Sequence, residues 1–92
     1  MLEKNPLKER LAAGKPALGT WNTLASPLVT DALAHSGLDF VVVDMEHGPF
    51  RPDLVAPAVS ACEARGVSPL VRLPALEAWM VLQALDSGHQ GF

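Results

Sequence analysis

A repeated order of helix-like segment, glycine and short apolar run is the feature that most constrains how this chain can fold. The repeat is marked by four glycines, each placed where a helix would end and a strand would begin: Gly14, Gly37, Gly66 and Gly88. Glycine is favoured there because it adopts the left-handed conformation that closes a helix. The pattern predicts helices that start at Asn5-Pro6 and Ser26-Pro27 and helices over residues 53–65 and 76–87, with strands over residues 16–21, 38–43, 67–73 and 89–92.

These alternating segments predict an α/β fold with a parallel sheet. Parallel strands cannot be joined by a tight turn, so a crossover helix must lie between each pair. Such crossovers are right-handed, which brings the carboxyl ends of all strands to one side of the sheet. Three to four βα units leave open sheet edges, whereas a closed (β/α)8 barrel needs eight strands and about 250 residues. We therefore expect residues 1–92 to be a fragment, or a chain whose remainder is missing or supplied separately.

Composition excludes several classes of protein. The chain has 92 residues, of which 49% are hydrophobic, a formal net charge of -3 and an isoelectric point near 5.4. No run of Lys or Arg offers a footprint for phosphates, so a nucleic-acid partner is not expected. Polar residues and prolines interrupt the apolar stretches and no signal-like block stands at the N-terminus, so we predict a cytoplasmic protein without a membrane partner. Cys62 is the only cysteine and is expected to be a buried thiol rather than a nucleophile.

Apolar periodicity indicates which residues share a face of each helix. In the second helix the predicted stripe is Val29, Ala32, Leu33 and Ser36. The third helix carries two adjacent stripes, Leu54/Ala58/Ala61 and Val55/Val59/Cys62. In the fourth helix one face holds Ala78, Val81, Leu82 and Leu85, and packing roles are predicted for Trp79 and Met80.

Ionisable side chains gather directly after the second apolar run. Asp44, Glu46 and His47 follow it closely, and charged groups at the end of a buried strand are costly unless they are paired or used. Trp21 ends the first expected strand and Arg72 lies near the end of the third. Because the carboxyl ends of parallel strands meet on one side, these residues should share the face where α/β folds keep their active sites.

Six short motifs run through nearly the whole chain: Gly19-Thr20-Trp21, Ser26-Pro27, Gly37-Leu38-Asp39-Phe40-Val41, Val43-Asp44-Met45-Glu46-His47-Gly48-Pro49, Val71-Arg72, and Leu85-Asp86 with Gly88 and Gly91. In order and spacing they resemble the opening of the HpcH/HpaI aldolase family. This family comprises metal-dependent class II pyruvate aldolases and is related more distantly to citrate lyase beta subunits. The Asp-x-Glu-His-Gly-Pro element is specific, and the resemblance covers only the first third of a family member.

The resemblance implies that residues 1–92 are the N-terminal part of a single, apparently truncated (β/α)8 TIM-barrel domain. It also implies that the complete barrel reversibly cleaves a 4-hydroxy-2-oxo acid into pyruvate and an aldehyde. It implies that His47 is the catalytic base, that Asp44 orients it, and that Arg72 binds the pyruvate part and steadies the enolate. Trp21 would line the same pocket. Glu46 would contact these residues and not the substrate itself.

The resemblance also implies a divalent metal, Mg, Mn or Co, and a homo-oligomer. The metal ligands, a Glu and an Asp, are expected beyond Phe92, with none in this chain. Asp86 would lie near a subunit boundary and assist a neighbouring site. The 92-residue piece alone is therefore expected to be inactive.

Elementary chemistry agrees with these roles. Aldol cleavage needs a base for the 4-hydroxyl proton, and histidine titrates nearest to neutral pH. Asp44 can fix the imidazole tautomer, and the planar fork of Arg72 suits an α-keto acid that presents a carboxylate beside a carbonyl. No lysine lies in the expected cluster, which disfavours a Schiff-base mechanism.

Purely structural interpretations stay open for each residue. Asp44 also fits a cap for the turn that follows it. Glu46 is compatible with three roles: a metal ligand, a hydrogen-bond acceptor for residues that themselves contact the metal or substrate, or the ion-pair partner of a nearby arginine. Arg72 could form a structural salt bridge with Asp44 or Glu46. Trp21 could belong to the core or to a pocket wall. No function is assigned to His35 or His89.

Two classes of function therefore remain. The first is an aldolase that is complete only with the rest of the barrel. The second is a non-catalytic truncated βα module that acts through self-association or by docking on a partner through its open sheet edges. A CoA thioester lyase on the same barrel is a third alternative, which the short Gly48-Pro49 turn disfavours. The acceptor aldehyde is read mainly by later loops and is not predicted.

Overall fold

The computed structural model describes residues 5–47 and 51–86. These residues form α1 (Pro6–Ala12), β1 (Gly19–Asn22), α2 (Pro27–Ala34), β2 (Phe40–Asp44), α3 (Pro52–Glu63), β3 (Ser68–Arg72) and α4 (Ala78–Asp86). Each of these elements was predicted from the sequence, whereas the strand predicted over 89–92 lies outside the described residues. No helix in the described part is long and apolar enough to cross a membrane.

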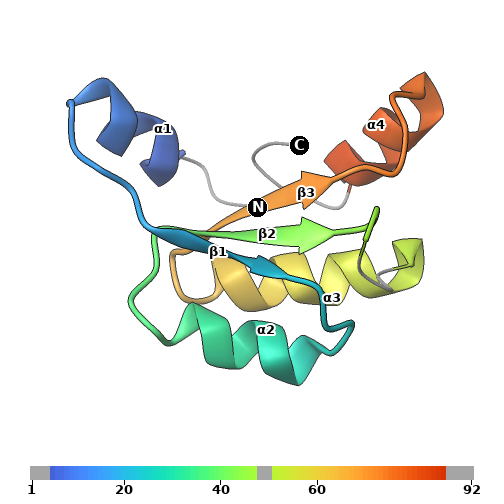
Figure 1. Ribbon diagram of the computed structural model, residues 1–92, viewed down its shortest axis with the longest axis horizontal. Coiled ribbons are helices and arrows are strands. Elements are labelled where there is room, and N and C mark those ends of the chain that lie inside the picture. The colour runs from blue at the N-terminus through green and yellow to red at the C-terminus, as the bar shows by residue number, and fades with distance from the viewer. Residues whose placement is uncertain (1–4, 48–50, 87–92) are drawn as a thin grey trace.

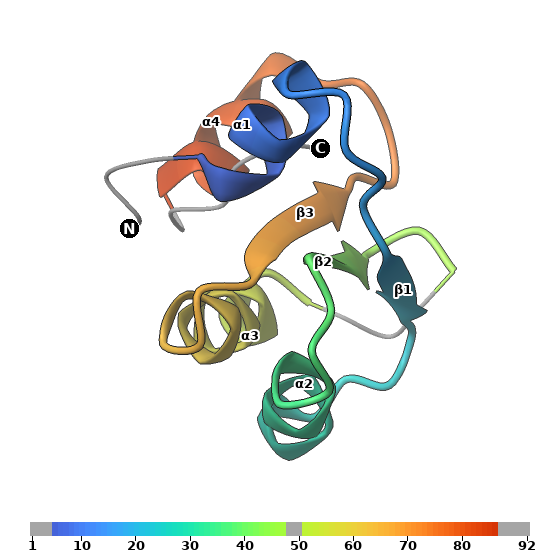
Figure 2. The same cartoon turned by 90° about the vertical axis from the view of Figure 1, so that its left-hand side faces the viewer.

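The strands form a parallel sheet in the order β1-β2-β3, which confirms the predicted α/β fold. Trp21 lies opposite Val42, which in turn lies opposite Leu70, and at the end of the sheet Asp44 lies opposite Arg72. α2 and α3 cover one face of the sheet (Figure 1). α1 and α4 lie on the other side, α1 toward the amino ends of the strands and α4 toward their carboxyl ends. Figure 2 looks along the strands and shows α2 and α3 side by side beneath the sheet.

Glycines close the first three helices, as the sequence predicts. Gly14, Gly37 and Gly66 have φ angles of 74°, 80° and 71°. A residue with a side chain would pay about 1–2 kcal/mol in this region, so glycine is the residue that lets the chain turn from helix to strand. Gly88 lies outside the described residues.

The core lies between the sheet and its two covering helices. One cluster joins the strands to α3 through Val43, Val55, Ala58, Val59 and Val71. A second cluster joins them to α2 and α3 through Ala34, Val41, Cys62 and Val67. The predicted stripe of Val55, Val59 and Cys62 is therefore confirmed as a buried face. Burial, with a smaller contribution from the charge of Glu63, raises the pKa of the Cys62 thiol to about 11, which keeps it protonated and unreactive.

The buried face of α2 differs from the predicted stripe. Thr30 and Ala34 are buried, whereas Ala32 and Ser36 are exposed. The reason is a polar contact, because the Nδ2 group of Asn22, at the end of β1, donates a hydrogen bond of 2.7 Å to the hydroxyl of Thr30. Both residues are almost completely buried. A satisfied pair of this kind is tolerated in a core, so a polar residue takes a position that periodicity assigned to an apolar one.

The apolar face predicted for α4 is largely exposed in the described part of the molecule. Ala84 is buried, while Leu82 is 63% exposed and Leu85 44% exposed. Trp79, predicted as a packing residue, is 60% exposed. Helical spacing shows that these side chains share a face, but it does not show whether a neighbouring element covers that face.

The contact between β1 and α2 leads to a prediction about stability. Thr30→Val should lower the free energy of unfolding by about 1–3 kcal/mol, because the amide Nδ2 of Asn22 would stay buried without its acceptor. Thr23→Val, at an exposed position, is the matched control and should change the free energy of unfolding by less than about 0.5 kcal/mol. Urea unfolding followed by circular dichroism measures both. Equal losses in the two variants would contradict a stabilising role of the buried pair.

Candidate active site

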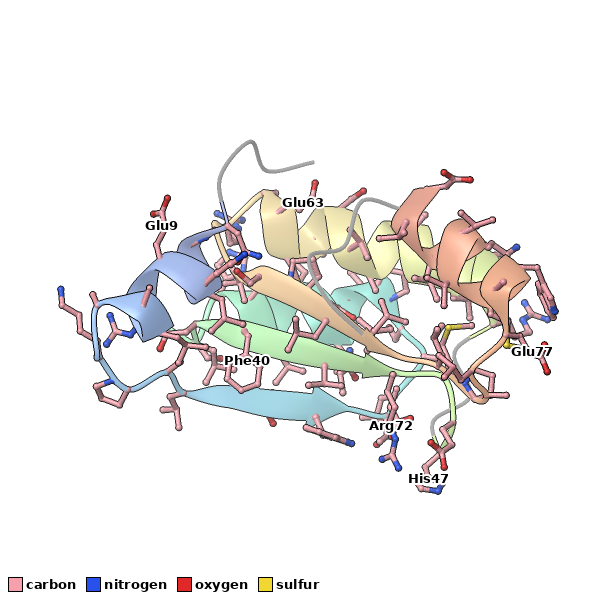
Figure 3. All side chains as sticks on the ribbon, turned by 90° about the horizontal axis from the view of Figure 1, so that it is seen from above. Glu9, Phe40, His47, Glu63, Arg72 and Glu77 are labelled. Atoms are coloured by element: carbon pink, nitrogen blue, oxygen red, sulfur yellow. The ribbon has the colours of Figure 1, made fainter. Side chains whose placement is uncertain are left out.

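Charged side chains from two strands and one turn meet at the carboxyl end of the sheet. Asp44 and Arg72, the last residues of β2 and β3, lie opposite each other in the parallel register. Glu46 and His47 follow Asp44 in the turn. Figure 3 shows Arg72 and His47 near each other, with both side chains projecting to the same side of this end of the sheet. The structure thus brings these four residues together, as the order of the strands predicts.

Asp44 fixes the turn through its carboxylate. Its side chain is completely buried, and Oδ1 accepts hydrogen bonds from the backbone N–H groups of Glu46 at 2.9 Å and His47 at 3.0 Å. These contacts are the turn cap that the sequence left open as an alternative. The carboxylate of Asp44 therefore holds the backbone of His47, whereas the imidazole ring of His47 contacts Glu46.

The surroundings of Asp44 keep it ionised. Burial by itself would raise the pKa of this carboxyl group. The backbone N–H groups of His47 and Glu46, followed by the positive charge of Arg72, outweigh burial and hold the pKa below its usual value of 3.8. Oδ2 is 3.7 Å from Nη1 of Arg72 and has no hydrogen-bond partner among the described residues. Oδ1 of Asp44 is therefore hydrogen-bonded, whereas Oδ2 interacts with Arg72 only through charge.

Glu46 lies between the guanidinium and the imidazole. Nε of Arg72 donates a hydrogen bond of 3.0 Å to Oε2 of Glu46. The other oxygen, Oε1, lies 3.5 Å from Nε2 of His47, whose side chain is 64% exposed. The ion pair with an arginine, one of three alternatives for Glu46, is therefore present. Arg72 in turn faces two carboxylates, as its structural interpretation anticipated.

A cleft of about 760 Å³ opens beside this cluster. It is lined by Trp21 of β1, Val42 of β2, Leu70 and Arg72 of β3, Glu46, and the segment after β3 that includes residues 74–76. Trp21 is 55% exposed, so it belongs to the cleft wall and not to the core. The sequence does not indicate that the segment after β3 lines the cleft, because an apolar loop carries no signal that distinguishes a cleft wall from packing.

The described residues do not fit a metal centre. No group of three or more His, Cys, Asp or Glu side chains that could hold a metal ion is found among them. The carboxylates near the cleft are engaged elsewhere, Asp44 with backbone amides and Glu46 with Arg72. Asp86 is exposed at the last residue of α4, and its predicted role toward a neighbouring subunit stays a prediction.

A parallel α/β sheet with charged side chains and a cleft at the carboxyl ends of its strands has the architecture of an α/β enzyme. The chain belongs to the HpcH/HpaI aldolase/citrate lyase family, whose model matches residues 17–92.

Two curated relatives illustrate the similarity. The hydroxypyruvate/pyruvate aldolase of Paraburkholderia phytofirmans is 42% identical over 86 residues, which cover 91% of this chain and 33% of the relative. The 5-keto-4-deoxy-D-glucarate aldolase of Salmonella paratyphi A is 35% identical over 88 residues, which cover 96% of this chain and 34% of the relative. The chain therefore spans about a third of the length of the curated relatives it matches.

Solved structures are likewise similar to this chain over about a third of their length. A HpcH/HpaI aldolase/citrate lyase family protein from Burkholderia cenocepacia superimposes with a TM-score of 0.83 at 42% identity, over 94% of this chain and 35% of that structure. The citrate synthase SbnG superimposes with a TM-score of 0.86 at 35% identity, also over 94% of this chain and 35% of that structure. The three parallel βα units thus align with the N-terminal third of TIM barrels of this family.

The lowered pKa of Asp44 leads to a prediction about pH. An acid with a lowered pKa in the folded state stabilises the fold above its usual pKa, and this contribution is lost as the pH falls through the folded pKa. Asp44→Asn should therefore lower the free energy of unfolding at pH 7 by about 1.5–3 kcal/mol, the range for hydrogen bonds to a charged group. The difference from wild type should shrink as the pH falls below about 4.

Urea unfolding between pH 3 and pH 7 measures this difference. Asp53→Asn is the matched control, because Asp53 is paired with Arg51 at 3.1 Å on the exposed surface, where ion pairs contribute about 0–1 kcal/mol. A destabilisation by Asp44→Asn that stays constant with pH would contradict a role of the ionised carboxylate.

Proposed function

We propose that this chain forms part of the active site of a metal-dependent pyruvate aldolase, which reversibly cleaves a 4-hydroxy-2-oxo acid into pyruvate and an aldehyde. The observation that carries the proposal is the placement of Arg72 and His47 on either side of the Glu46 carboxylate, with Arg72 and Glu46 lining a cleft at the carboxyl end of the sheet. The names of two relatives, a hydroxypyruvate/pyruvate aldolase and a 5-keto-4-deoxy-D-glucarate aldolase, support it.

His47 is proposed as the base. Its ring is mostly exposed and lies 3.5 Å from Glu46, which lines the cleft, and imidazole suits proton transfer near neutral pH. It removes the proton of the 4-hydroxyl group as the bond between carbons 3 and 4 breaks and the aldehyde forms. The electron pair of that bond passes into the enolate of pyruvate, and protonation of the enolate carbon gives pyruvate. Asp44 supports the base by fixing the backbone turn that carries it.

Arg72 is proposed as the group that binds the keto acid. Its guanidinium is a permanent cation at the edge of the cleft, and it can donate parallel hydrogen bonds to a carboxylate. The same charge opposes the negative charge that develops on the enolate oxygen. Trp21 provides an apolar wall that keeps water from the methylene part of the substrate.

The remainder of the active site is proposed to lie in later βα units. A divalent metal, Mg, Mn or Co, would supply Lewis-acid chemistry when bound, and its ligands are proposed to be the Glu and the Asp of later βα units that the family resemblance implies. We propose that the complete protein is a cytoplasmic homo-oligomer, in which Asp86 lies close to a neighbouring subunit.

A second candidate is a binding module without catalysis. It is favoured by the apolar side chains that the described part leaves exposed, among them Leu76 at 91% and Leu82 at 63%. Such side chains would suit self-association or docking on a partner. This function would need neither Arg72 nor His47, so variants of those residues separate the two candidates.

We expect His47→Ala to reduce pyruvate release from a 4-hydroxy-2-oxo acid by about 10²–10⁴-fold, the usual contribution of a general base. His35→Ala is the matched control, because His35 ends α2 and contacts Asp31 on the exposed surface. The assay couples pyruvate to lactate dehydrogenase, with added Mn or Mg and after EDTA treatment, on protein whose intact mass has been measured.

Three outcomes decide the proposal. Activity that is lost in His47→Ala and kept in His35→Ala supports the aldolase. Activity that survives His47→Ala contradicts the role of this base. Protein of about 9.8 kDa that releases no pyruvate with either metal excludes catalysis by this chain alone and leaves a fragment of the enzyme or the module.

A further inference from the structure

We infer that Glu46 is a positioning residue that orients Arg72 for a carboxylate ligand and sets the imidazole of His47 beside it. This inference rests on the proposed function, since it assumes that the ligand is a keto acid. Beyond the ion pair with an arginine, the inference gives this one carboxylate a role toward the anion-binding group and the base together.

The turn after β2 delivers Glu46 to this place. Oδ1 of the buried Asp44 accepts hydrogen bonds from the backbone N–H groups of both Glu46 and His47. The backbone of the two residues is thus held by one atom. The side chain of Glu46 then reaches across to β3, where Oε2 accepts the Nε–H of Arg72 at 3.0 Å. Its Oε1 lies 3.5 Å from Nε2 of His47.

The contacts of Arg72 leave one edge of its guanidinium for a ligand. An arginine can grip a carboxylate with two parallel hydrogen bonds, either through Nε and one Nη or through the two Nη groups. Glu46 occupies Nε, and Asp44 lies 3.7 Å from Nη1, beyond hydrogen-bond distance. The pair of Nη groups is therefore the edge left for a ligand carboxylate in the cleft that Arg72 lines.

Glu46 has two opposite effects on the affinity of Arg72 for an anionic ligand, one through its charge and one through its hydrogen bond. As a negative charge beside Arg72, it weakens the attraction of any anion. As a hydrogen-bond acceptor, it holds the guanidinium in one orientation, so less conformational freedom is lost when the ligand binds. Two substitutions separate the effects, because Glu46→Gln and Glu46→Ala remove the same charge and only the glutamine retains an acceptor for Nε–H.

The first measurement is the affinity of oxalate, a planar dianion that resembles the enolate of pyruvate, by isothermal titration calorimetry on the whole chain. We expect Glu46→Ala to bind oxalate about tenfold more weakly than Glu46→Gln. Equal affinities of the two variants, or tighter binding by Glu46→Ala, would overturn the positioning role. Glu77→Ala, which removes an exposed charge next to the residues that line the cleft, is the matched control and should leave the affinity unchanged.

The second measurement needs no ligand. The Nε–H resonance of Arg72, assigned by its loss in Arg72→Lys, should exchange slowly with water in wild type and in Glu46→Gln, and at least tenfold faster in Glu46→Ala. Unchanged exchange in Glu46→Ala would overturn the inference. If wild type binds no oxalate, the proposed keto-acid site fails in this chain, and the exchange of Nε–H alone then decides whether Glu46 positions Arg72.

Discussion

The burial of one carboxylate at the end of β2 is the constraint on which the geometry of the site depends. A buried charge costs several kcal/mol unless it is paired and hydrogen-bonded, and Asp44 is completely buried. Two backbone N–H groups of the following turn bond to it, and the guanidinium of the neighbouring strand lies beside it. Because these partners are needed to keep the charge inside, the turn has little freedom. Its next residues are therefore held at the same edge as Arg72.

The parallel register decides which side chains can reach the cleft. Trp21, Val42 and Leu70 lie opposite one another across the three strands, and all three line the cleft. Their neighbours along β2, Val41 and Val43, pack in the clusters formed with α2 and α3. Successive residues of a strand point to opposite faces, so a slip by one residue would place the core side chains in the cleft. The interactions that stabilise the sheet therefore also position the site.

Proteins with the same fold can catalyse different reactions. Proteins that resemble this chain at 35% identity or more include two named aldolases and a named citrate synthase. One barrel architecture can host different reactions because chemistry depends on a few groups at the ends of strands. For this chain those groups are a guanidinium, two carboxylates and an imidazole beside an apolar cleft. They suit the binding of an α-keto acid and the transfer of one proton.

The sequence by itself determined the order of the elements, the helix-closing glycines and the end of the sheet where the charged residues meet. These features follow from local chemistry, since periodicity, caps and strand ends are encoded within a few neighbouring residues. It also indicated that Asp44, Glu46, His47 and Arg72 would lie together, because carboxyl ends of parallel strands share one side.

Only the tertiary structure decided which of these groups pair. Glu46 contacts Arg72 across 26 residues of sequence, and the carboxylate of Asp44 holds the backbone of His47 while that of Glu46 faces its ring. Thr30 is buried because Asn22 reaches it from another element, and the apolar face of α4 is exposed because no described element covers it. Such pairings depend on distances of a few ångströms between separate segments and on which surfaces meet, and no local pattern of residues specifies either.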